Sequence, residues 1–159
     1  MPGKMFSNIP NEFEPLRKDL WSLEFAKEFN IPETFQVTAN RPKVNNPRKE
    51  IMYKNLTTYY KGKTTVEELN ISFRDVIGPS VFQKIYNWQR QHTDFATGQG
   101  GYASTYKTTI TLNMEDPTGA VVQKFIYYGC FITGLDGGDL SMEDDGVAMV
   151  TMTVSYDSF

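Results

Sequence analysis

Residues 65–75 read Thr-Val-Glu-Glu-Leu-Asn-Ile-Ser-Phe-Arg-Asp, and this stretch decides the class of fold. Leu69, Ile71 and Phe73 alternate with polar residues, which predicts a strand with one face in a core and the other in water. Such a strand needs a sheet to belong to, so we expect strands on either side of it.

A helix is predicted directly after this strand. Gly78-Pro79-Ser80 places a proline in the first turn, where its missing N–H costs nothing. Apolar residues then recur at i, i+3, i+4 and i+7, which makes one apolar stripe and predicts a helix to about His92. We expect the stripe to reach the core through three side chains: Phe82, Ile85 and Trp88.

The other strands are predicted over residues 20–25, 35–40, 51–60, 106–114, 120–133 and 148–156. Most of them show period-two alternation, whereas residues 120–133 are apolar on both faces, which indicates a central strand. Residues 41–48 carry two prolines and paired asparagines, which excludes them from a sheet interior. Lys61-Gly62-Lys63 and residues 116–119 are turn signals.

The order of strands, one helix and more strands predicts a mainly β fold, an antiparallel sandwich or barrel with one flanking α-helix. The chain of 159 residues suits one domain. We assign residues 17–159 to this domain. Residues 1–16 are polar and interrupted by prolines, and we interpret them as an N-terminal arm.

Composition excludes several classes of protein. The net charge of −3 disfavours a dedicated nucleic-acid binder, and the single cysteine, Cys130, excludes an internal disulfide and a multi-cysteine zinc site. Neither a signal peptide nor a membrane-spanning run is recognisable. We expect a soluble protein made in a reducing cytoplasm, with no membrane partner.

Charge is unevenly distributed along the chain. Residues 41–63 carry a net charge of +6, whereas residues 136–145 carry five acidic residues and no basic one. The acidic run does not place its carboxylates at the positions of a twelve-residue calcium loop, so a solvated turn or a contact surface is the better interpretation.

Catalytic chemistry finds no support in the sequence. His92 is the only histidine, and its place at the end of the predicted helix favours a role in capping the last carbonyls. Residues 97–101 are glycine-rich but follow a helix, and no Lys-Ser/Thr comes directly after them, which disfavours a phosphate loop. We expect no enzyme, no cofactor and no metal site.

Read in order, residues 17–159 resemble the tail tube protein of contractile-tailed bacteriophages. The resemblance is carried by residues 65–75, by the helix end Ile85-Tyr86-Asn87-Trp88-Gln89, and by Gly129-Cys130-Phe131-Ile132-Thr133-Gly134-Leu135. An acidic link around Asp139-Leu140 and a long final strand follow. Compared with longer members of that family, the 41–50 connection is short.

The resemblance implies hexameric rings whose sheets join into one continuous inner β-barrel, stacked with a helical twist into a virion tail tube. It implies contacts with the tail sheath, tape measure, baseplate and tail-terminator proteins, and transient passage of genomic DNA. An acidic chain suits that passage, because each phosphate contact would add affinity and retard the DNA.

A tube that grows head to tail needs two different, complementary surfaces on each subunit. We take the two charged segments as candidate ring-stacking contacts: Arg41, Lys43, Arg48, Lys49, Lys61 and Lys63 on one side, and Asp136, Asp139, Glu143, Asp144 and Asp145 on the other. Polar strand faces are candidates for the lumen: Gln36, Thr38, Asn40, Thr109, Thr111 and Asn113.

Three alternatives stay open. The first is a tube initiator, baseplate or tail-end ring of the same fold, and the second is the tube of a contractile injection or secretion system. The third is a small nucleic-acid-binding β-barrel that uses residues 41–63, where Tyr53, Tyr59 and Tyr60 interleave with lysines and could stack on bases.

Overall fold

The computed structural model describes residues 14–24, 31, 33–78 and 80–159. Most of the expected N-terminal arm, residues 1–13, lies outside this range, as do Phe25 and Pro79.

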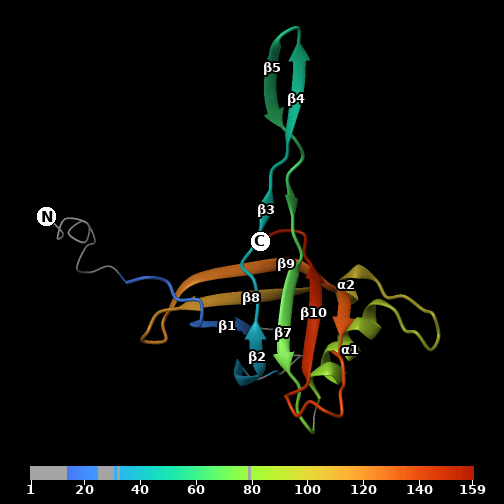
Figure 1. Ribbon diagram of the computed structural model, residues 1–159. Coiled ribbons are helices and arrows are strands. Elements are labelled where there is room, and N and C mark those ends of the chain that lie inside the picture. The colour runs from blue at the N-terminus through green and yellow to red at the C-terminus, as the bar shows by residue number, and fades with distance from the viewer. Residues whose placement is uncertain (1–13, 25–30, 32, 79) are drawn as a thin grey trace, which may run out of the picture.

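The main element is a six-stranded sheet with strand order β1-β8-β9-β10-β7-β2, in which every neighbouring pair is antiparallel (Figure 1). Its strands are β1 (Trp21–Glu24), β2 (Gln36–Thr38), β7 (Leu69–Arg74), β8 (Thr108–Glu115), β9 (Val121–Asp136) and β10 (Met149–Ser155). The mainly antiparallel β prediction is confirmed.

β9 belongs to both halves of this sheet. Its first part pairs with β8 as far as Cys130, and its last part pairs with β10 from Phe131 onward. Just before this change of partner, where the register with β8 shifts, Gly129 has φ +68°, a conformation that side chains rarely adopt, and a Cβ there would run into the Asp157 carboxylate. The strand bends at this glycine, so β8 and β10 run in clearly different directions (Figure 1).

The predicted barrel is not closed in the described part of the chain, because β1 and β2 form the two edges of the sheet. One side chain bridges this seam. The Leu23 N–H donates to Gln36 Oε1 at 3.1 Å, and Gln36 Nε2 donates to the Leu23 carbonyl at 3.2 Å. The Gln36 amide therefore pairs with the free edge of β1 as a strand backbone would.

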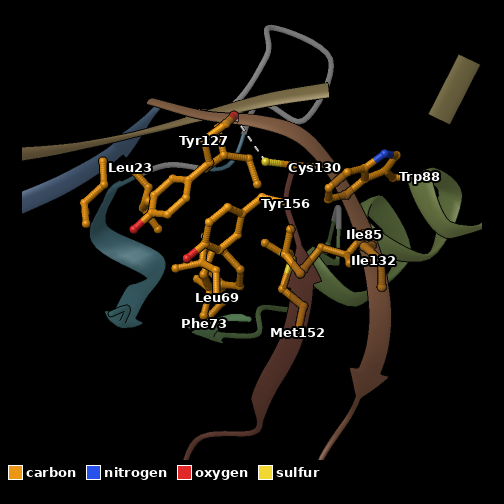
Figure 2. Close-up of a cluster of buried hydrophobic side chains, with 14 of the residues drawn as sticks. Leu23, Leu69, Phe73, Ile85, Trp88, Tyr127, Cys130, Ile132, Met152 and Tyr156 are labelled. Carbon is orange, nitrogen blue, oxygen red and sulfur yellow. Dashed lines mark hydrogen bonds between the residues drawn. The ribbon is translucent and has the colours of Figure 1, made fainter. Parts of the chain in front are cut away.

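The core lies where the two halves of the sheet face each other and the helix (Figure 2). The alternation predicted for residues 69–73 is confirmed, because Leu69, Ile71 and Phe73 are fully buried. Buried aliphatic, aromatic and sulfur side chains from β8, β9, β10 and the residue after β10 belong to the same cluster: Ile110, Leu112, Tyr127, Cys130, Ile132, Val150, Met152, Val154 and Tyr156.

The predicted helix is α1 (Val81–His92). Ile85 and Trp88 are buried as expected, but Val81 takes the third core position and Phe82 is only partly buried. The register is set at the N-terminus, where Asp75 Oδ1 accepts from the Val81 N–H and the Ser80 hydroxyl, both at 3.0 Å. This acid, not Ser80, supplies the side-chain cap.

Two local predictions are wrong near the end of α1. Tyr106 closes a short second helix, α2 (Ala103–Tyr106), because its carbonyl accepts the Trp88 indole N–H at 2.7 Å instead of entering a strand. The last carbonyls of α1 are capped by the N–H groups of Thr93 and Gly101. The His92 ring lies between Tyr106 and Phe131 in an aromatic cluster.

A two-stranded arm rises from the sheet between β2 and β7 (Figure 1). It consists of β3 (Val44–Asn45) with β6 (Thr65–Val66), and β4 (Arg48–Tyr53) with β5 (Leu56–Lys61). At a rise of about 3.3 Å per residue, residues 44–53 span roughly 30 Å. Residues 41–50 therefore include β3 and the start of β4, in one limb of this arm.

The arm corrects two further predictions. Residues 51–60 form a hairpin and not one strand, with a two-residue turn at Lys54-Asn55 where Lys54 has φ 51°. Gly62 does not end a hairpin but lies inside the arm, where its N–H donates to the Pro47 carbonyl at 2.6 Å. The prolines interrupt the ladder there, so the exclusion of residues 41–48 from the main sheet holds.

Candidate assembly surfaces

The outer arm, residues 48–61, has no layer packed against it in the described structure. Every residue of β4 and β5 is exposed, including Ile51, Met52, Tyr53 and Leu56. A two-stranded hairpin alone in water is marginal in stability, and exposed apolar residues in such a group mark a contact surface. The outer arm is therefore a candidate contact surface.

The two faces of this hairpin differ in chemistry. Directly opposed residues of an antiparallel pair share a face. The pairs Lys49–Tyr60, Ile51–Thr58 and Tyr53–Leu56 form what we call the apolar arm face. The pairs Arg48–Lys61, Glu50–Tyr59 and Met52–Thr57 form the charged arm face.

The candidate cations are distributed over the length of the arm. At its base, Lys43 lies 3.9 Å from Glu67, an exposed ion pair of small energetic weight. Further out, the Arg48 guanidinium lies 4.3 Å from the centre of the Tyr59 ring on the charged arm face. Lys61 lies on that face too, whereas Lys49 lies on the apolar one.

Asp136, the first of the acidic candidates, is the last residue of β9, and the others lie in the loop that joins β9 to β10. Two of them order the loop itself, since Asp136 accepts from the Gly138 N–H and Asp144 from the Gly146 N–H. Asp139, Glu143 and Asp145 are exposed. Leu140 and Met142 are 89% and 105% exposed, so the loop presents apolar side chains that the charge pattern did not predict.

These apolar residues line a surface pocket. It is formed by residues 138–142, 144 and 146–149, and it includes Leu140, Met142, Val147, Asp139 and Asp144. We call this surface the acidic pole. The loop is anchored to the sheet at Ala148, whose carbonyl accepts the Asp75 N–H at 2.9 Å.

The arm and the acidic pole lie at opposite ends of the subunit (Figure 1). The hairpin β4–β5 stands at the top of the view, and the loop between β9 and β10 lies at the bottom, below the sheet. Basic and acidic candidates are therefore kept apart within one molecule. They can meet only between molecules.

The lumen candidates divide into two groups. Thr38 and Thr109 are exposed, and Thr111 is partly exposed. The three amides are used within the subunit. Gln36 bridges the seam, Asn40 Oδ1 accepts the Asn70 N–H at 2.7 Å, and Asn113 is only 3% exposed with its Nδ2 donating to Glu24 Oε1.

Burial governs the titratable groups in the core. Desolvation raises the pKa of the Cys130 thiol to about 11 and raises the pKa values of Tyr127 and Tyr156 above their usual range. The thiol donates to the Tyr127 carbonyl, and the Tyr127 hydroxyl donates to the Asn40 carbonyl at 3.0 Å. These groups are neutral packing residues at pH 7.

Among the described residues no cluster of His, Cys, Asp and Glu has the arrangement of a metal site. The helices that the structure describes are too short or too polar to cross a membrane. Sequence reasoning missed the apolar arm face and the bridging Gln36. Residues 51–60 do not alternate, so neither feature has a periodic signature in the sequence.

No protein-family profile matches the chain, and no curated protein matches it. Several solved structures, however, align with it. A chain of the anti-feeding prophage cap, described as a tube-terminating cap, aligns with a TM-score of 0.73 at 15% identity, covering 98% of this chain and 95% of that one.

Two chains from an extracellular contractile injection system also align. One, from the sheath/tube terminator in the extended state, has a TM-score of 0.72 at 14% identity, covering 92% of this chain and 95% of that one. The other, from the extended sheath-tube complex, has a TM-score of 0.60 at 17% identity, covering 90% and 88%. The chain thus has the fold of tail-tube-related proteins.

Proposed function

We propose that the chain is a structural, non-enzymatic subunit of the tube of a contractile tail or contractile injection particle. The observation that carries this proposal is the pair of complementary surfaces at opposite ends of one tube-type fold. Such a pair is what a head-to-tail contact requires, and a head-to-tail contact that does not close on itself produces a filament. The location of the protein would then be the virion tail or particle.

We further propose that subunits form six-membered rings around a lumen. A related fold occurs in an anti-feeding prophage baseplate solved with sixfold symmetry, at a TM-score of 0.68 and 10% identity. Thr38, Thr109 and Thr111 remain the lumen candidates, because the three amides are used inside the subunit. An uncharged hydroxyl surface would let DNA or other cargo slide with little adhesion.

A ring that ends a tube is the second candidate. The cap and terminator chains align with TM-scores of 0.73 and 0.72, above the 0.60 of the sheath-tube chain. A terminal ring would contact sheath and baseplate or terminator proteins on one side and a tube ring on the other. Its subunits would form single rings and stop.

Negative-stain electron microscopy of the purified protein over a concentration series separates these roles. Hollow tubes of uniform width support the tube subunit. Isolated rings support the terminal ring. Monomers at every concentration contradict both and return attention to nucleic-acid binding by residues 41–63, which salt-dependent DNA binding would then measure.

Charge reversal tests whether the stacking contact is basic against acidic. Replacing Lys43, Arg48 and Lys49 by Glu should block tube growth. The matched control mixes that variant with a second one in which Asp139, Asp144 and Asp145 are replaced by Lys; complementary charge should restore co-assembly. Normal tubes from the first variant alone would refute the charge contact while leaving the tube role intact.

A further inference from the structure

The apolar arm face is the less satisfied of the two faces of the hairpin. On the charged arm face, Arg48 covers the ring of Tyr59, so this aromatic surface already has a partner. On the apolar arm face, the Ile51, Tyr53 and Leu56 side chains are exposed, whereas the charged arm face exposes Met52 as its one aliphatic side chain. Contact between proteins should therefore bury the apolar arm face first.

Two cations accompany this face. Lys49 lies directly opposite Tyr60 on it. Lys54, in the turn, has its Nζ 5.3 Å from the centre of the Tyr53 ring. The face therefore combines an apolar centre with positive charge beside it. A complementary partner surface would carry both apolar residues and carboxylates.

The acidic pole has that composition. Leu140, Met142 and Val147 are exposed around a pocket whose lining also includes Asp139 and Asp144. The pole lies at the opposite end of the subunit from the arm, so the two surfaces cannot meet within one molecule (Figure 1).

We propose that the apolar arm face of one copy docks into the acidic pole of a second copy. The arm tip, Tyr53 and Leu56, fills the pocket, and Lys49 and Lys54 lie beside its carboxylates. The charged arm face, with Arg48 and Lys61, stays outside the contact, so of the three cations in the charge-reversal variant Lys49 is the one that meets the acidic pole. This inference rests on the proposed function and goes beyond it by naming the face, the anchors and the receiving pocket.

Adjacent tyrosines provide a matched pair of variants. Tyr59 and Tyr60 are 49% and 52% exposed, but they lie on opposite faces. Tyr60→Ser should raise the subunit concentration needed for assembly by about 10- to 100-fold, the effect of losing one buried aromatic side chain. Tyr59→Ser should change it by less than roughly 3-fold. Equal effects of the two variants would overturn the assignment of the face.

Disulfide trapping tests the contact directly. Leu56→Cys combined with Leu140→Cys should give, under mild oxidation, a ladder of cross-linked oligomers in non-reducing gels. Thr57→Cys with Leu140→Cys is the control, because Thr57 is the next residue but lies on the charged arm face. The native Cys130 is fully buried and stays out of the reaction.

The outcomes separate this inference from the function on which it rests. Rings or tubes with a ladder from the Leu56 pair alone support the inference. Rings or tubes with no ladder, or with equal ladders from both pairs, overturn it and leave the proposed function standing. A wild-type protein that stays monomeric at every concentration overturns the proposed function and the inference with it.

Discussion

Replacing Gln36 by Leu should destabilise the fold, because one amide bridges the two edges of the sheet. The change removes the bonds at 3.1 and 3.2 Å to the N–H and carbonyl of Leu23 and leaves both groups at the edge of β1. At about 0.5–1.5 kcal/mol for each bond, the loss is roughly 1–3 kcal/mol. For a chain of this size that corresponds to a fall in Tm of roughly 3–10 °C.

Two measurements check this expectation. Urea unfolding gives the loss of stability, and amide hydrogen exchange reports on the Leu23 N–H, which should lose its protection. Gln83→Leu is the matched control, since Gln83 bonds Asn87 on the exposed side of α1 at 3.0 Å. Its effect should stay within about 0.5 kcal/mol.

Gln36→Glu separates the two bonds. At neutral pH a carboxylate can still accept from the Leu23 N–H but cannot donate to the Leu23 carbonyl. Below the usual carboxyl pKa of about 4.3 the protonated acid regains a donor, so the deficit relative to wild type should shrink on acidification. The reasoning is refuted if Leu23 keeps full protection in Gln36→Leu.

Three further changes have calculable effects. Gly62→Ala should loosen the arm alone, because the new Cβ would lie 2.7 Å from the Pro47 carbonyl oxygen; amide exchange should speed up in the arm while the unfolding midpoint moves little. Ile85→Ala should cost about 2–5 kcal/mol in thermal unfolding, against less than about 0.5 kcal/mol for exposed Gln83→Ala. Burial raises the pKa of the Cys130 thiol to about 11, against 9.0 for a free thiol, so between these pH values the unfolded chain loses this proton more readily than the folded one. The contribution of the thiol to stability is therefore complete below pH 9 and declines as the pH rises toward 11. Urea midpoints that stay constant over that range would contradict this account.

Elements whose core faces follow a single simple period could be predicted from the sequence. β7 and β10 alternate strictly, since each lies in the sheet interior with one face in the core. The stripe of α1 was equally clear, although Val81 replaced Phe82 at the core. In these elements burial follows the period of the backbone, so the pattern is legible.

The rest depended on information that is not local. The Lys54-Asn55 turn contains neither glycine nor proline, so the sequence of residues 51–60 did not distinguish one strand from a hairpin. Tyr106 continues the alternation of β8 but is held in α2 by Trp88, which is 18 residues away. The charged candidates were located by composition, whereas their separation to opposite ends followed only from the fold.

The root of the arm determines how it would carry force. One strand of the arm runs directly into β7, and Figure 1 shows the arm continuing the line of that strand. β7 is flanked by β10 and β2, and ladder bonds stand perpendicular to the strands. A pull on the arm tip therefore acts along β7 and shears its hydrogen bonds to β10 and β2. These bonds share the force, whereas a pull across the strand would break them one at a time. The root of the arm would therefore resist a pull along its length better than a pull across it.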